Sequence, residues 1–90
     1  MFKTLEELIT VIRQRKVSST EGSYTKKLLK DKKLSIEKVK EEITELIDAI
    51  EKNSNKVHES ADVLYHLTVL LEANDIKIEG VMEELKKRQK

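Results

Sequence analysis

The sequence has no cysteine and no proline, and it contains only two glycines and 3% aromatic residues. The absence of cysteine excludes disulfide bridges and thiolate metal sites, which fits a reducing compartment such as the cytoplasm. The scarcity of proline and glycine favours helices, because these two residues interrupt them. No run of apolar residues has the length of a membrane span, and the chain does not begin like a signal peptide. We therefore expect a cytoplasmic, helical protein.

An excess of charge of one sign is also missing, because 18 basic residues balance 17 acidic ones. Such a chain has no overall field that attracts nucleic acid or a membrane surface, and it has few aromatic rings on which bases could stack. The basic residues of the segment 86–90 are typical of a helix C-terminus. Neither nucleic acid nor a membrane is an expected partner.

Helix-forming residues make up most of what is present. Charged residues account for 39% of the 90 positions, and leucine, isoleucine, glutamate and lysine dominate. This composition predicts an all-α fold, a small four- to five-helix bundle in a single domain over residues 1–90. A chain this short buries a modest core, so self-association is a natural source of further burial.

Polar breaks and capping residues predict where the first helices lie. Thr4 and Glu7 have the spacing of a capping box, and the helix that they start should run to about Arg15. Residues 17–23 are rich in small polar side chains and are expected to form a loop. Ser23, at the end of this loop, or one of its neighbours is expected to cap a short second helix.

Ser35 is expected to cap a third helix, whose apolar stripe should face the core of the bundle. The stripe consists of Ile36, Val39, Ile43, Leu46, Ile47 and Ile50. A short polar turn at 52–55 makes the next helix its antiparallel neighbour. That fourth helix is apolar on nearly all sides over residues 61–73, which is more than one small bundle covers. We therefore expect at least a homodimer.

Two acidic pairs lie in this helical hairpin, Glu42-x-x-Glu45 and Glu59-x-x-Asp62. A spacing of three places both carboxylates of a pair on one side of a helix, roughly one turn apart. Two such helices packed together would gather four carboxylates at one point. Ligation by oxygen alone suits Mg²⁺, which often accompanies nucleotide phosphates. We therefore predict that Glu42, Glu45, Glu59 and Asp62 bind Mg²⁺; solvated surface acids are the alternative.

Other polar side chains close to these pairs are candidates for supporting roles. Glu41 lies about 100° around the helix from Glu42 and is either a group that assists the ligands or plain surface. Lys38 precedes Glu42 by four residues. His66 follows Asp62 by four residues, and a structural role is favoured over metal binding because hard cations prefer oxygen.

The segment 22–25 (Gly-Ser-Tyr-Thr) offers hydroxyls and backbone N–H groups at the start of a helix, which are groups that polyphosphate needs. Basic residues flank it on both sides: Arg13, Arg15, Lys16, Lys26 and Lys27. The glycine spacing is not that of a P-loop. From the pattern alone, a capped turn with basic surface residues is the simpler interpretation.

Three blocks of the sequence carry a resemblance to a known family. They are Arg15-Lys16 with Glu21-Gly22-Ser23-Tyr24-Thr25-x-Lys27-Leu28-Leu29, then Lys38-x-x-Glu41-Glu42-x-x-Glu45, and finally Glu59-Ser60-Ala61-Asp62-Val63-Leu64-Tyr65-His66-Leu67. Together they resemble the phosphoribosyl-ATP pyrophosphohydrolase family over most of the chain, from about Leu5 to Leu85. The acidic pairs alone indicate only the wider MazG-like superfamily of all-α nucleotide pyrophosphohydrolases. Departures at Lys40 and His58 leave the four predicted ligands unchanged.

The resemblance implies hydrolysis of phosphoribosyl-ATP to phosphoribosyl-AMP and pyrophosphate with Mg²⁺, the second step of histidine biosynthesis. It also implies the stand-alone form, since the chain has no room for the cyclohydrolase domain that some relatives carry. Glu41 and Glu42 are the predicted catalytic residues, and the sequence leaves open which carboxylate takes a proton from the attacking water. The predicted substrate-binding residues are Arg15, Ser23, Tyr24, Thr25, Lys27, Lys38 and His66.

Two other functions stay open at this point. One is a house-cleaning pyrophosphohydrolase that acts on ordinary or damaged nucleoside triphosphates and shares the metal site. The other is a non-catalytic helical adaptor whose acidic residues are surface charges. The adaptor predicts no specific Mg²⁺ binding and no loss of function in Glu45→Gln or Asp62→Asn.

Overall fold

The computed structural model describes residues 1–18 and 23–89, and these ranges contain five helices and no strand. The helices are α1 (Lys3–Val17), α2 (Tyr24–Lys30), α3 (Lys32–Lys52), α4 (Lys56–Ala73) and α5 (Ile78–Arg88). The predicted all-α fold is therefore confirmed. None of these helices combines the length and the apolar composition that crossing a lipid bilayer requires.

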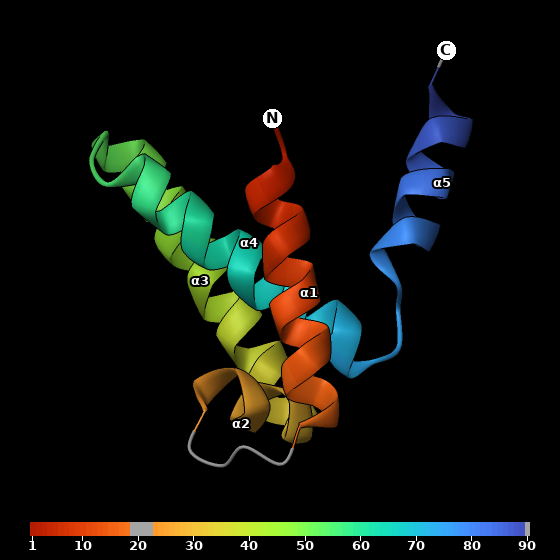
Figure 1. Cartoon of the computed structure of the whole chain (residues 1–90). Coiled ribbons are helices and arrows are strands. Elements are labelled where there is room, and N and C mark those ends of the chain that lie inside the picture. The colour runs from red at the N-terminus through yellow and green to blue at the C-terminus, as the bar shows by residue number, and fades with distance from the viewer. Residues whose placement is uncertain (19–22, 90) are drawn as a thin grey trace.

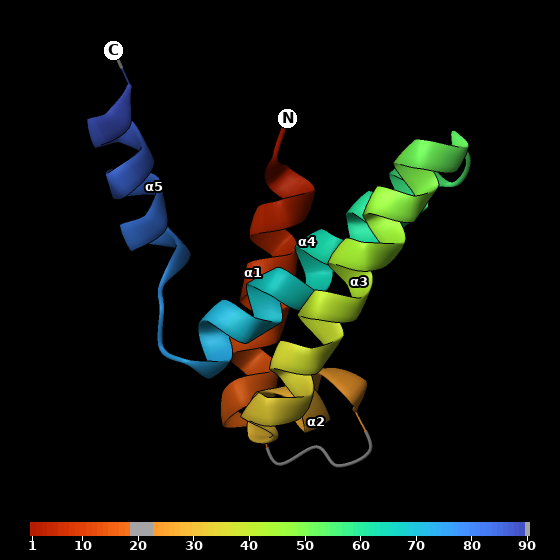
Figure 2. The same ribbon diagram turned by 180° about the vertical axis from the view of Figure 1, so that it is seen from behind.

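Helices α3 and α4 form a long antiparallel hairpin that dominates the molecule (Figure 1). The turn between them places Asn53 and Asn55 in the left-handed region, with φ of 54° and 53°, which asparagine tolerates better than most residues. Helix α1 packs beside α4, and α2 lies across the base of the hairpin. Figure 2 shows the same arrangement from behind, with α5 standing apart from the other helices.

Capping differs from the sequence prediction at two helix starts. Helix α1 begins at Lys3, with Phe2 at the N-cap and no side-chain cap, so Thr4 does not act as the cap of a capping box. Asp31, rather than Ser35, caps α3, because its carboxylate accepts a 3.0 Å hydrogen bond from the backbone N–H of Leu34. The expected cap at Ser23 is confirmed.

The isoleucines of α3 do not face the core of this chain, contrary to the prediction for the apolar stripe. The exposed fractions are 43% for Ile36, 41% for Ile43, 52% for Ile47 and 57% for Ile50. The buried face of α3 consists instead of Ser35, Val39 and Ala49, with Glu42 and Leu46 half-buried between them. These five positions follow a heptad spacing, so they form one seam along the helix.

The hydrophobic core joins α1, α2 and α4. It consists of Ile12, Leu28, Leu29, Val69 and Ala73, with Leu8, Leu34 and Tyr65 packed against it. Leu28 is fully buried one turn after the start of α2. The core therefore holds α2 against the C-terminal half of α4, with Tyr65 of α4 packed against it.

Candidate functional site

Acidic side chains of α3 and α4 converge between the two helices of the hairpin. One carboxylate oxygen each of Glu42, Glu45 and Glu59 lies within 4.8 Å of the other two. The helical period explains this arrangement, because Glu42 and Glu45 lie one turn apart on one side of α3 and Glu59 meets them from α4. The structure thus brings three of the four predicted metal ligands to one point.

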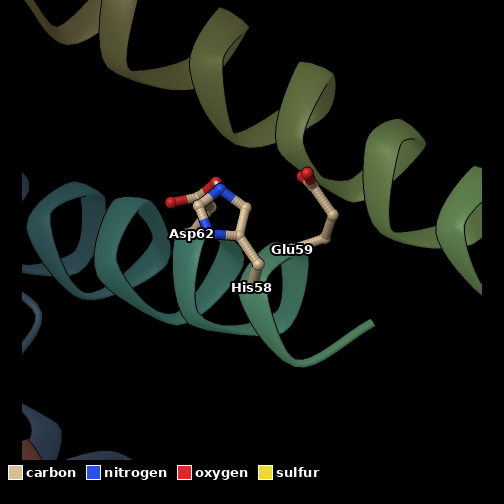
Figure 3. A group of neighbouring side chains, drawn as sticks. All are labelled: His58, Glu59 and Asp62. Carbon is tan, nitrogen blue, oxygen red and sulfur yellow. Dashed lines mark ion pairs between the residues drawn. The ribbon is translucent and has the colours of Figure 1, made fainter. Parts of the chain in front are cut away.

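Asp62, the fourth predicted ligand, lies in an adjoining group with His58 and Glu59. Its carboxylate is 3.4 Å from Nε2 of His58. Figure 3 shows these two side chains against each other, while the carboxylate of Glu59 reaches toward α3. Glu59 therefore belongs to both groups. His58 is a residue of this group that was not among the predicted site residues, although its spacing of four from Asp62 places both on one helix face.

Two carboxylate oxygens in this region are buried without a hydrogen-bond partner among the described residues, Oε2 of Glu42 and Oε2 of Glu59. Burial raises the pKa of Glu42, and the nearby carboxylate of Glu45 raises it further. Burial is also the main reason for the raised pKa of Glu59, with Glu45 and Asp62 adding to the rise. A bound divalent cation would satisfy the orphaned oxygens and offset the repulsion, so the residues present fit Mg²⁺.

Glu41, the other predicted catalytic acid, lies outside the acidic cluster. Its carboxylate accepts a hydrogen bond of 3.3 Å from the ammonium group of Lys38, and this contact is the main reason for the raised pKa of Lys38. Glu41 and Lys38 therefore form an ion pair on α3 beside the cluster.

The first turn of α2 is tied to α4 by two side-chain contacts. The hydroxyl of Tyr24 lies 2.9 Å from Nε2 of His66, and the hydroxyl of Thr25 is hydrogen-bonded to that of Tyr65. The rings of Tyr24 and Tyr65 stack on each other, and the ring of His66 meets both of them edge to face. Because His66 also contacts the backbone oxygen of Asp62, at 2.8 Å, these residues connect α2 to the acid-bearing part of α4.

Ser23 acts as the N-cap of α2, with its hydroxyl oxygen accepting a hydrogen bond of 3.3 Å from the backbone N–H of Lys26. Residues 19–22, which include the predicted Glu21 and Gly22 of the family motif, lie outside the described residues. The predicted segment 22–25 is thus described from Ser23 onward.

Most of the basic residues that flank this segment serve the fold. Two of them form ion pairs: Arg13 with Glu72 and Glu79, and Lys16 with Asp75. A third, Lys26, donates hydrogen bonds to the backbone oxygens of Arg15, Lys16 and Ser18. Lys26 thereby satisfies carbonyls at the C-terminus of α1. Arg15 and Lys27 form no side-chain ion pair with a described residue, so they are the cations of this group that remain available to a ligand.

Sequence comparisons relate the chain to a single enzyme family. The sequence model of phosphoribosyl-ATP pyrophosphohydrolase matches residues 5–89. A phosphoribosyl-ATP pyrophosphatase of Methanocella arvoryzae is 43% identical over the full length of both chains, and one of Rhodobacter capsulatus is 44% identical over 93% of this chain and 84% of its own length. A histidine biosynthesis bifunctional protein of Pyrococcus furiosus is 47% identical over 96% of this chain, which spans 41% of that protein.

Proposed function

The chain belongs to the phosphoribosyl-ATP pyrophosphohydrolase family, and on that premise we propose that it hydrolyses phosphoribosyl-ATP to phosphoribosyl-AMP and pyrophosphate with Mg²⁺. This reaction is the second step of histidine biosynthesis. The observation that carries the proposal is the convergence of Glu42, Glu45 and Glu59, with two orphaned carboxylate oxygens among them. Such an arrangement is costly unless a cation completes it.

Glu42, Glu45 and Glu59 would hold the metal, and Asp62 adjoins them through the group that it shares with Glu59. When bound, Mg²⁺ would supply positive charge that offsets the charge of the triphosphate and of the departing pyrophosphate. Lys38 lies beside this cluster and supplies a further cation for the phosphates.

The proton of the attacking water needs an acceptor on the protein. The carboxyl group that takes this proton is one that the metal leaves uncoordinated, because a bound cation lowers the pKa of its ligands and weakens them as bases. Glu41, which lies outside the acidic cluster and pairs with Lys38, is one candidate, and an acidic residue of the cluster that does not bind the ion is the other. Neither a nucleophilic serine nor a cysteine is required, since water is the second substrate.

We include a homodimer in the proposal because the hairpin exposes apolar rows that a single chain leaves uncovered. On α3 the row consists of Ile43, Ile47 and Ile50, and on α4 Leu64 is 52% exposed and Leu67 37%. Burying these side chains against a second copy would contribute about 25 cal/mol of free energy for each Å² of apolar surface removed from water.

Pyrophosphate release tests the function directly. The purified protein is incubated with phosphoribosyl-ATP and with a panel of ordinary nucleoside triphosphates, once with Mg²⁺ and once with EDTA. We expect turnover of phosphoribosyl-ATP that stops in EDTA. Preference for an ordinary triphosphate would be consistent with the metal site but would contradict phosphoribosyl-ATP as the substrate. No release from any substrate would support the adaptor.

A further inference from the structure

His66 connects Tyr24 to the backbone of α4 through both nitrogens of its ring. Nδ1 lies 2.8 Å from the backbone oxygen of Asp62, and Nε2 lies 2.9 Å from the hydroxyl oxygen of Tyr24. A carbonyl oxygen only accepts hydrogen bonds, so Nδ1 carries a hydrogen. In the tautomer whose single ring hydrogen is on Nδ1, Nε2 is an acceptor, and Tyr24 donates its hydroxyl hydrogen to it.

A phenol whose hydrogen is already engaged presents only lone pairs to a ligand. Tyr24 is 46% exposed, so a ligand has access to this side chain. Tyr24 lies close to the acid-bearing part of α4, because its hydrogen-bond partner His66 contacts the backbone oxygen of Asp62, one helical turn earlier. Phosphate oxygens are acceptors too and would find no donor at the oxygen of Tyr24.

We propose that Tyr24 accepts a hydrogen bond from the sugar or base of the bound nucleotide and that His66 positions Tyr24 for this role. This inference rests on the proposed function and assigns a specificity residue within it. Ribose hydroxyls and base amino groups are the donors that a nucleotide offers. The inference differs from the expectation that the hydroxyls of segment 22–25 serve phosphate.

Binding measurements separate the two roles of Tyr24. Phosphoribosyl-AMP has the sugars and the base, whereas inorganic tripolyphosphate has phosphates alone. In Tyr24→Phe we expect the Kd of phosphoribosyl-AMP to rise about five- to tenfold, the size of one neutral hydrogen bond, and that of magnesium tripolyphosphate to stay unchanged. Equal weakening of both ligands would show that Tyr24 donates to phosphate, and unchanged binding of both would show that it contacts neither. Either result overturns the proposal.

The Kd of ribose 5-phosphate shows which group of the nucleotide donates the hydrogen bond to Tyr24. If Tyr24→Phe weakens its binding as well, the donor is a sugar hydroxyl; if only phosphoribosyl-AMP is affected, the donor belongs to the base. His66→Leu removes the acceptor of the Tyr24 hydrogen, so it should weaken phosphoribosyl-AMP as Tyr24→Phe does. The double variant should lose little more, because both changes act on one contact. Additive losses would contradict a positioning role for His66.

Nitrogen NMR of the His66 ring tests the hydrogen-bond direction without any ligand. We expect Nδ1 protonated and Nε2 unprotonated in the wild type, and a change at Nε2 in Tyr24→Phe. Tyr65→Phe is the matched control, because its hydroxyl contacts Thr25 rather than His66. A hydrogen found on Nε2 of the wild type would overturn the proposal. If the protein fails to hydrolyse phosphoribosyl-ATP, the proposed function fails, and the same measurements are made with the monophosphate product of the nucleotide that it does hydrolyse.

Discussion

The carboxylates of Glu42 on α3 and Glu59 on α4 approach within 4.8 Å of each other, and each keeps one buried oxygen without a hydrogen-bond partner among the described residues. Two like charges at this distance oppose the packing of the hairpin that carries them. The site thus reduces the stability of the metal-free protein, and this relationship governs several of the predictions below.

Mg²⁺ should raise the melting temperature. At a concentration of one hundred times its Kd, an ion that binds only the folded state contributes about 2.7 kcal/mol, which corresponds to roughly 10 °C or more for a domain of this size. Differential scanning calorimetry in Mg²⁺ and in EDTA measures the shift. Glu59→Gln should abolish most of it, whereas Glu51→Gln, an exposed change on α3, should preserve it. A shift of equal size in both variants would argue against the site.

Removing one acidic charge should impair catalysis without unfolding the protein. We expect Glu45→Gln and Asp62→Asn each to lower kcat/KM by about 100-fold, the usual scale for losing one group that stabilises transition-state charge. Asp48→Asn is the control, because Asp48 lies on α3 and pairs with Lys52 at the surface. Full activity in both site variants would exclude the proposed metal centre.

Acid should stabilise the metal-free protein at first and then destabilise it. The raised pKa values of Glu42 and Glu59 mean that the folded state holds these protons more tightly than the unfolded state. Stability should therefore increase as the pH falls through the raised pKa of each folded group toward its lower unfolded pKa. The effect should shrink in Glu42→Gln, and thermal melts in EDTA across pH measure it. A wild-type stability that is flat over this range would contradict the prediction.

Further acidification should lower the stability of the protein. Hydrogen bonds from Arg13 lower the pKa of Glu79 to about 2, and Lys16 lowers the pKa of Asp75. The stability from these pairs is present above the unfolded pKa of each carboxyl group and is lost as the pH falls through its folded pKa. Glu79→Gln should thus reduce the sensitivity of the melting temperature to strong acid, while leaving the slope of the melting temperature against pH unchanged near neutrality.

Arg13 should contribute to stability chiefly through Glu72. The carboxylate of Glu72 is buried and accepts a hydrogen bond of 3.1 Å from Arg13, so Arg13→Leu leaves a buried charge without this partner. We expect a loss of about 2 kcal/mol in urea unfolding. Adding Glu72→Leu should recover much of it, since both groups are then apolar. Losses that simply add would show that the two residues are independent.

The exposed isoleucines of α3 should determine the oligomeric state. Ile47→Glu places a charge in the apolar row and is expected to convert the proposed dimer to a monomer, which light scattering after size-exclusion chromatography detects. Thr44→Glu is the matched control, because Thr44 is exposed on the same helix outside that row. A wild-type protein that is monomeric at every concentration would reject the dimer.

Local sequence patterns predict the helical hairpin and the meeting of its acids, because both follow from the helical period and a short turn. They fail at α3 in two ways. A single residue separates α2 from α3, so Asp31 takes the cap expected of Ser35. Periodicity also identifies an apolar face without showing what covers it, so it predicts a core position for isoleucines that are exposed in the single chain.

Long-range contacts account for the other differences. Arg13 and Lys26 have the charge that a phosphate site needs, yet each is occupied by groups that only the fold brings near. Arg13 meets Glu72 across 59 positions of sequence, a distance at which no local pattern has information. His58 is the opposite case, since its spacing from Asp62 was visible in the sequence.

The short turn between α3 and α4 has a consequence for the order of folding. Every proposed metal ligand lies within residues 42–62, so the acids meet through contacts that are local in sequence. Contacts of this kind form fastest because little chain entropy is lost in closing them. The cation site should thus assemble while α1 is still free, and the distant link between Arg13 and Glu72 should close later. A nascent chain could then bind its ion before the core is complete.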